Sequence, residues 1–140
     1  MSGADDFIAR VRATGLPIEK LVVVGSGLLE VLHLRQAQDI DISVAADVFA
    51  ALATNVDFTA DNGLGVLHYH YRHDNIEVWP FFADRVSDTP FVYQTVLENS
   101  QVINGVRFIT PEFLLMWKRR ANRPKDKNDI TLLEEYIRER

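Results

Sequence analysis

The pattern of apolar and polar residues predicts short helices and short strands along the chain. Apolar residues recur at helical spacing in the segments 4–13, 47–54, 111–121 and 125–138. Strand-like runs, either fully apolar or alternating with period two, cover residues 21–24, 66–71 and 75–82, and a further strand ends at Val44. Thr110 directly before Pro111 marks a helix start, because Thr can cap the helix and Pro suits its first turn.

Turn-forming residues connect these elements and join strands into hairpins. His73-Asp74 separates two of the predicted strands, and Asn104-Gly105 lies within 100–109, where both residues suit the positive φ angles of a type I′ turn. Residues 58–64 are rich in turn formers, with Asp61-Asn62-Gly63 as the predicted connection. Hairpins intermixed with helices predict an α/β (α+β) domain, in which a mixed sheet is flanked by helices and the last two helices are C-terminal.

The segment from Leu21 to Val44 carries the most specific chemistry of the chain. It predicts a buried strand, a Gly-Ser-Gly turn, a helix and a second strand with Asp39 and Asp41. Successive side chains on a strand point to opposite faces, so these two aspartates share one face. Neighbouring carboxylates repel each other, and Mg²⁺, which prefers hard oxygen ligands, removes that cost.

The turn at Gly25, Ser26 and Gly27 lies where the first strand is followed by a helix. Backbone N–H groups and the positive end of the helix dipole can face a phosphate at such a position. The simpler alternative is that the turn is a tight connection and that the aspartates edge a sheet without binding anything. The order and spacing of the two motifs favour a functional site.

Composition indicates a compact protein with a single domain, residues 1–140. Of the 140 residues, 47% are hydrophobic and 25% are charged, which suits one core of ordinary size. There is no cysteine, so disulfides and thiolate zinc sites are excluded. No apolar run reaches the length that spans a membrane, and we expect a cytoplasmic protein with no membrane partner. The net charge of −5 argues against broad attraction to nucleic acid, although a local basic patch leaves that partner open.

The first motifs resemble a known family. A hydrophobic strand, Gly25-Ser26, twelve intervening residues and then Asp39-Ile40-Asp41 is similar to the core motif of the DNA polymerase β type nucleotidyltransferase superfamily. Arg35 matches a basic position common in its small bacterial members. The resemblance implies a nucleotidyltransferase fold, Mg²⁺ or Mn²⁺ held by the aspartates, and an NTP whose triphosphate lies at the Gly-Ser loop.

A third carboxylate is expected on the strand 75–82. Alternation along it puts Glu77, Trp79 and Phe81 on one face. Members of the superfamily carry a carboxylate on a strand next to the Asp-x-Asp strand, and Glu77 resembles it. The resemblance implies that Glu77 binds metal or activates the acceptor hydroxyl as general base. The alternative is a solvent-facing strand residue.

Two histidines lie on the neighbouring strand. His68, His70 and Arg72 share a face of the predicted strand 66–71 and its end. Histidines at positions i and i+2 can bind a transition metal, whereas a solvated face of an antiparallel sheet is the commoner arrangement. We expect the solvated face.

The C-terminal segment 108–137 resembles small stand-alone bacterial nucleotidyltransferases of the abortive-infection toxin and antibiotic-resistance types. The matching positions are Lys118, Arg123, Lys125, Asp126 and Asp129. The resemblance implies that Lys118 and Lys125 join Gly25, Ser26 and Arg35 in binding the nucleotide, because a cation near the phosphates neutralises charge on the leaving pyrophosphate. The alternative is a basic turn between two helices, with Asp126 and Asp129 as helix caps.

Together the residues predict a nucleotidyltransferase that moves a nucleoside monophosphate from an NTP to an unidentified acceptor. ATP is the expected NTP, and the acceptor is a small molecule, a protein or an RNA end. The predicted catalytic residues are Asp39, Asp41, Glu77 and Lys118, and the first three are the predicted metal ligands. A homodimer could complete the acceptor site, and a toxin–antitoxin role follows from the resemblance alone. The alternative function is a catalytically silent domain of the same fold that binds a nucleotide or a protein.

Overall fold

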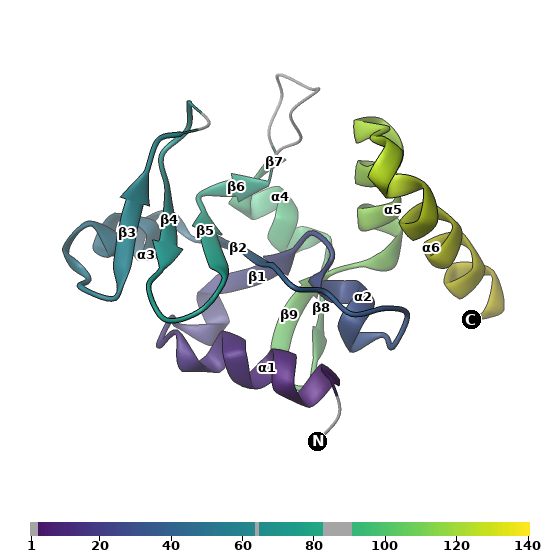
Figure 1. The fold of residues 1–140 in the computed structure, drawn as a ribbon, viewed down its shortest axis with the longest axis horizontal. Helices are drawn as coiled ribbons and strands as arrows, with labels where there is room; N and C mark the ends of the chain where they lie inside the picture. The colour runs from purple at the N-terminus through teal and green to yellow at the C-terminus, as the bar shows by residue number, and fades with distance from the viewer. Residues whose placement is uncertain (1–2, 64, 83–90) are drawn as a thin grey trace.

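The computed structural model describes residues 3–63, 65–82 and 91–140. Helices and strands are intermixed along this part of the chain (Figure 1). The helices are α1 (Gly3–Ala13), α2 (Gly27–Val31), α3 (Ala46–Ala51), α4 (Tyr93–Glu98), α5 (Pro111–Ala121) and α6 (Lys127–Glu139). Short 3₁₀ turns lie at Ile18–Lys20, Leu52–Thr54 and Pro124–Asp126. The strands are β1 (Leu21–Val24), β2 (Ile40–Val44), β3 (Phe58–Asp61), β4 (His68–Tyr71), β5 (Ile76–Trp79), β6 (Phe81–Phe82), β7 (Phe91–Val92), β8 (Ser100–Ile103) and β9 (Val106–Ile109).

A mixed sheet forms the centre of the molecule. Its strand order is β3-β4-β5-β2-β1-β9-β8. The β2 strand runs antiparallel to β1 and parallel to β5, and β1 runs parallel to β9. The pair β6–β7 forms a separate small antiparallel sheet. The predicted fold class, a mixed sheet flanked by helices with helices at the C-terminal end, is confirmed at this level.

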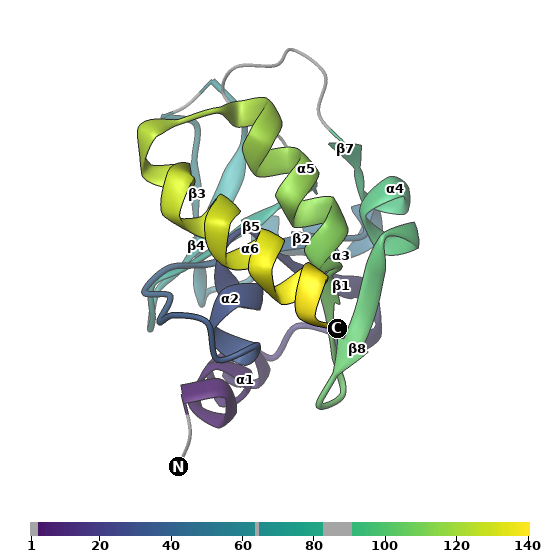
Figure 2. The same ribbon diagram turned by 90° about the vertical axis from the view of Figure 1, so that its right-hand side faces the viewer.

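Helices pack on the sheet through large apolar side chains. On the side of α1, the ring of Phe7 lies 5.9 Å from that of Phe108 on β9, and Phe49 of α3 meets Tyr69 of β4 edge-on at 5.2 Å. The helices α5 and α6 lie side by side, as both views show (Figure 2). Trp117 of α5 stacks on Phe82 of β6 with ring centres 4.5 Å apart.

Several local predictions are confirmed because local chemistry alone determines them. The α5 helix covers the predicted residues 111–121, and the Thr110 hydroxyl accepts a hydrogen bond from the Phe113 N–H at 3.2 Å. In the hairpin of β8 and β9, Asn104 and Gly105 have φ angles of 51° and 83°, as a type I′ turn requires.

Other local predictions are wrong. Residues 58–61 of the predicted turn segment form β3, which pairs with β4 although Thr59 and Ala60 are exposed; Leu64 of that segment lies outside the described residues. The predicted strand 75–82 is divided at Pro80, which has no N–H for the sheet ladder. Beyond it, β6 pairs with β7.

The last helix also differs from the prediction, because α6 begins at Lys127, after the 3₁₀ turn at Pro124–Asp126. The α4 helix at Tyr93–Glu98 was not predicted at all. Within the described residues, no helix combines the length and the apolar character that crossing a bilayer needs.

The close packing of Gly27 explains why this position has no side chain. A Cβ added there would lie 2.4 Å from Cζ of Phe7 and 2.9 Å from Cγ1 of Val23. Both distances are shorter than real Cβ contacts, and Phe7 and Val23 are fully packed in the core. This glycine therefore allows α2 to approach α1 and β1 closely.

Gly27→Ala is expected to lower the free energy of unfolding by about 1–3 kcal/mol, because overpacking at a buried contact outweighs the better helix propensity of Ala. Urea denaturation of the wild type and the variant measures the change. In a Phe7→Leu background the same substitution is expected to cost less, since the ring atom that clashes is gone. An equal cost in both backgrounds would contradict a clash with Phe7.

Candidate functional site

The carboxylates of β2 and β5 meet across two parallel strands. Asp41 and Glu77 are register partners, so their side chains leave the same face of the sheet on strands about 4.8 Å apart. The next side chains along β2, Ile40 and Ile42, are fully buried on the opposite face. The sheet therefore holds two carboxylates side by side.

Asp39 joins this pair at the start of β2. It directly precedes the strand, is exposed, and its Oδ1 accepts a hydrogen bond from the side-chain amide of Asn75. Asp39, Asp41 and Glu77 all line the same cleft. The structure thus places the three carboxylates that the sequence singles out along one cleft.

The environment of Asp41 disfavours its ionised form. Burial raises the pKa of Asp41, the negative charges of Glu77 and Asp39 raise it further, and the result is a value of about 6. The indole N–H of Trp79 donates a hydrogen bond to Asp41 Oδ1 at 3.3 Å and opposes this shift. Asp41 therefore holds its proton more tightly than an exposed aspartate does.

The Gly25-Ser26 loop runs directly beside Asp41. Gly25 has a φ of 70°, which glycine adopts without strain, and a Cβ added there would lie 3.4 Å from Asp41 Oδ2. On the other side, the Ser26 hydroxyl accepts a hydrogen bond from Lys118 Nζ at 3.3 Å. The α2 helix that follows has five residues, so its dipole adds little to this loop.

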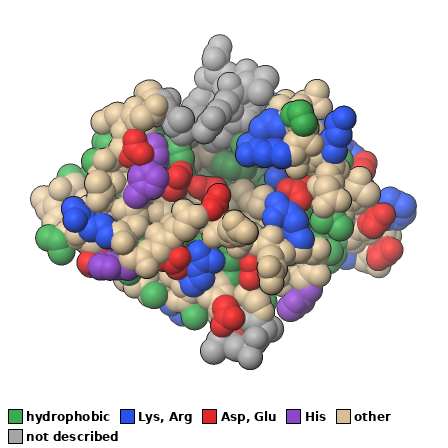
Figure 3. Space-filling view, in the orientation of Figure 1, with side chains coloured by type: hydrophobic (Ala, Val, Ile, Leu, Met, Phe, Trp, Pro, Cys, Tyr) green, Lys and Arg blue, Asp and Glu red, His purple; other side chains and the backbone are tan. Residues whose placement is uncertain are grey.

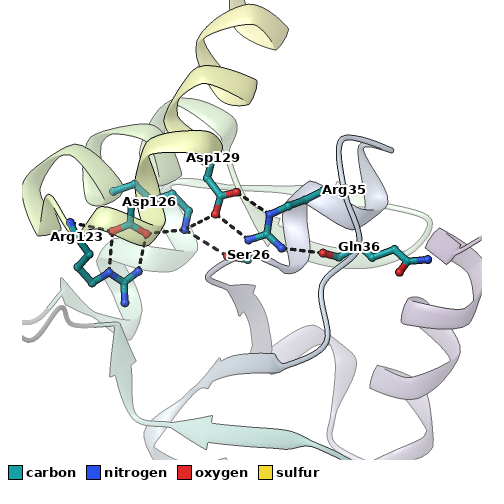
Figure 4. Close-up of polar contacts among 7 residues, drawn as sticks. Ser26, Arg35, Gln36, Arg123, Asp126 and Asp129 are labelled. Atoms are coloured by element: carbon teal, nitrogen blue, oxygen red, sulfur yellow. Dashed lines mark hydrogen bonds and ion pairs between the residues drawn. The ribbon is translucent and has the colours of Figure 1, made fainter.

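A network of cations and carboxylates forms the opposite side of the site (Figure 4). Lys118 is 2% exposed, and its Nζ lies 3.3 Å from Asp126 Oδ1 and 3.1 Å from Asp129 Oδ2. Arg35 forms two hydrogen bonds to Asp129 at 2.6 and 2.7 Å, and Arg123 forms two to Asp126 at 2.7 and 2.8 Å. These contacts tie the segment before β2 to the C-terminal helices.

The charges of this network do not cancel. Burial raises the pKa values of Asp126 and Asp129, but hydrogen bonds and charges from Arg123, Arg35 and Lys118 outweigh burial and hold both pKa values below the usual range. Both carboxylates are therefore ionised at neutral pH, and the three cations exceed them by one charge. Lys118 links this network to the Gly25-Ser26 loop through its bond to Ser26.

A cleft of about 940 Å³ separates the two sides. Figure 3 shows carboxylates near the centre of this face, His side chains beside them over β3 and β4, and Lys and Arg side chains toward α5 and α6. Lys125 is exposed and lines the cleft. The aromatic residues that line the cleft are Trp79, Phe81, Phe82 and Trp117.

The structure modifies two expectations for individual residues. Arg35 and Lys118, predicted to bind nucleotide, are both paired with carboxylates of the C-terminal segment. Asp126 bonds Arg123 and Lys118 instead of capping α6. Sequence reasoning missed the bond from Trp79 to Asp41, although the placement of Trp79 on the face of Glu77 was a usable signal.

Comparison of the chain with the sequence patterns of known protein families, with curated proteins and with solved structures finds no match. The resemblance to nucleotidyltransferases therefore stays a prediction that depends on the residues and geometry described above.

The raised pKa of Asp41 predicts how stability depends on pH in metal-free protein. The contribution of Asp41 to the free energy of unfolding is highest below pH 3.8, falls as the pH rises to about 6, and stays low above that. The reason is that the native state binds the proton of Asp41 more tightly than the unfolded chain does. Asp41→Asn removes this penalty. The variant is expected to be more stable than the wild type by about 2–3 kcal/mol at pH 7.5, with almost no difference at pH 4.

Urea denaturation in EDTA at the two pH values measures this difference. Protonation of Asp126 and Asp129 destabilises both proteins equally at low pH and cancels in the comparison. Glu139→Gln, which removes an exposed carboxylate far from the cleft, is the control and is expected to change stability little at either pH. An Asp41→Asn variant less stable than the wild type at pH 7.5 would refute the assigned electrostatics.

Proposed function

We propose that the protein is a Mg²⁺-dependent nucleotidyltransferase with a nucleotidyltransferase fold. The observation that supports this most is the register pair Asp41 and Glu77, in which Asp41 lies beside Gly25, while Lys118 contacts Ser26 from the other side of the loop. A carboxylate cluster suits a divalent metal, and an adjacent glycine loop with a cation suits a polyphosphate. The two halves of such a site lie in one cleft.

The metal ligands in this proposal are Asp39, Asp41 and Glu77. They offer hard oxygen donors, which suit Mg²⁺ or Mn²⁺, and the raised pKa of Asp41 reflects its burial beside the negative charges of Glu77 and Asp39. Mg²⁺ bound there would neutralise the carboxylates and the phosphates of an NTP and act as a Lewis acid on the transferred phosphoryl group.

The triphosphate is proposed to lie along Gly25 and Ser26. Without a Cβ at Gly25, a phosphate can approach the backbone closely next to Asp41. Lys118 and Arg35, at the inner wall, contribute the surplus charge, and Lys125 is exposed at the same cleft. These cations would stabilise the negative charge that develops on the leaving pyrophosphate.

Glu77 is proposed as the group that accepts the proton of the acceptor hydroxyl. Its carboxylate lines the cleft, and Oε1 lies 3.7 Å from Nδ1 of His70. A positioned carboxylate at the reacting oxygen is suited to general base catalysis. Trp79 offers only one face for a base or an acceptor ring, because His68 stacks on the other at a centroid distance of 4.0 Å.

The volume of the cleft is in the range of small-molecule sites and can hold a nucleotide with part of an acceptor. We propose ATP as the NTP. The direct test incubates the full chain with each α-³²P-labelled NTP, Mg²⁺ or Mn²⁺ and a cell extract as acceptor pool. Labelled product together with released pyrophosphate is the expected result. Failure to label anything with every NTP, while nucleotide still binds, would replace the proposal by the silent binding domain.

Asp41→Asn is expected to abolish transfer, and Glu77→Gln is expected to lower kcat by about 100-fold or more while NTP affinity changes little. Rates of pyrophosphate release measure both effects, and Glu139→Gln is the control with unchanged rate. Transfer by Asp41→Asn at the wild-type rate would overturn the metal assignment. A Glu77→Gln variant that loses NTP binding and turnover equally would make Glu77 a metal ligand only.

Lys118→Met tests the phosphate half of the site separately. Affinity for α,β-methylene ATP with Mg²⁺ is expected to fall by about 10-fold or more, the scale of a lost charge-assisted interaction. The variant should still fold, because Asp126 and Asp129 keep their arginine partners. Lys127→Met, an exposed lysine that does not line the cleft, is the matched control for calorimetry. Equal affinities in both variants would restrict Lys118 to a structural role.

A further inference from the structure

Histidine and aspartate side chains gather on the edge of the sheet next to the carboxylate cleft. Asp61 of β3 is the register partner of His68 of β4, and His70 of β4 is the register partner of Glu77 of β5. Their side chains leave the sheet on the face that carries Asp41. A polar row thus crosses the strands β3, β4, β5 and β2.

The donor atoms of Asp61, His68 and His70 converge on one point. Asp61 Oδ2 lies 2.6 Å from Nε2 of His70 and 3.6 Å from Nε2 of His68, and one ligand atom from each residue lies within 4.8 Å of the others. In a tetrahedral zinc site with bonds of about 2.0–2.1 Å, neighbouring donors are about 3.3 Å apart. The two distances from Asp61 to the histidines, 2.6 and 3.6 Å, lie on either side of that value.

Asp61 and His68 each form, through the atom that points away from the cluster, the kind of hydrogen bond that metal ligands usually form. Asp61 Oδ1 accepts from the Gly63 N–H at 2.6 Å, which leaves Oδ2 for the histidines. The Val66 carbonyl lies 2.9 Å from His68 Nδ1, and Glu77 Oε1 lies 3.7 Å from His70 Nδ1. A carbonyl can only accept, so His68 carries its proton on Nδ1 and, when neutral, directs the lone pair of Nε2 at Asp61.

The solvated face expected for this strand is wrong for His68, which is buried, whereas His70 is partly exposed and Arg72 is exposed to solvent. His68 is 2% exposed, and its ring lies parallel to that of Trp79 with an interplanar angle of 8°. A neutral imidazole nitrogen opposite a carboxylate oxygen at 3.6 Å places two acceptors face to face. A cation between them would satisfy both.

We propose that Asp61, His68 and His70 form a site for one divalent transition metal ion of the Zn²⁺ type. Two imidazole nitrogens select such an ion over Mg²⁺ and Ca²⁺. Three protein ligands leave the fourth tetrahedral position for water or another ligand. Because Asp61 is on β3 and both histidines are on β4, the metal links these two edge strands next to the carboxylate cleft. None of its three ligands belongs to the nucleotide chemistry proposed above, and Glu77 is the residue that lies beside both sites.

Titration of chelator-treated full-length protein with Zn²⁺ alone, followed by calorimetry, tests the site. Wild-type protein is expected to bind one Zn²⁺ here and to unfold at a higher temperature with the ion than without it. Co²⁺ in place of Zn²⁺ is expected to give the intense visible absorption of a tetrahedral site with nitrogen donors. His70→Ala and Asp61→Asn are expected to weaken Zn²⁺ binding by about 100-fold or more and to remove the Co²⁺ spectrum.

Two control variants separate this site from other metal ligands. His73 pairs with Asp57 at 2.9 Å in the same hairpin region but does not belong to the cluster, so His73→Ala should retain the Zn²⁺ site. Asp41→Asn should also retain it, because Asp41 belongs to the carboxylate cleft. Circular dichroism of each variant verifies its fold, and His70 and Asp61 are both partly exposed, which favours folded variants. Zn²⁺ binding that survives in both His70→Ala and Asp61→Asn, or that is absent from the wild type, would overturn the proposal.

Discussion

The parallel pairing of β2 with β5 is the constraint on which the candidate site depends. It sets Asp41 beside Glu77 on one face and buries Ile40 and Ile42 on the other. A shift of the pairing by one residue would exchange these faces and bury the carboxylates in the core, so hydrophobic burial fixes the register. The apolar half of the strand thereby holds together two like charges that would otherwise separate.

The two sides of the cleft, the helical wall with Lys118 and the sheet wall with Asp41, differ in how their buried charges are balanced. On the helical wall, Lys118 is surrounded by carboxylates and arginines that satisfy one another, and only one positive charge remains unbalanced. On the sheet wall, burial and the acidic neighbours of Asp41 outweigh the indole N–H and His68, so the ionised form of Asp41 is disfavoured. Because each wall retains charge of one sign, the cleft suits a ligand that combines a cation with an anion, as a metal-bound polyphosphate does.

The sequence predicts the parts of the site that depend on local patterns and leaves out those that depend on distant contacts. Alternation along a strand was enough to group Asp39 with Asp41 and Glu77 with Trp79, and a Gly-Ser turn after an apolar strand was enough to mark the loop. The fold class and the helix after Thr110 followed from the same local rules. The bonds from Arg35 to Asp129 and from Lys118 to Ser26 join segments far apart in the chain, so no local sequence pattern predicts them. The same reason explains β3, whose exposed Thr59 and Ala60 resemble a turn until β4 supplies a partner.

The position of β1 between β2 and β9 has a consequence for the order in which the protein forms. Val23 pairs with Phe108, so β1 stays an open edge until most of the chain has been synthesised. Parallel contacts between segments so distant require closure of a long loop and are slow to form. The cations of α5 and α6 follow β9 directly in the chain. During synthesis on the ribosome, the carboxylates of β2 and β5 therefore precede Lys118 and Arg123, and the cleft is complete only after α5 and the turn that follows it have formed.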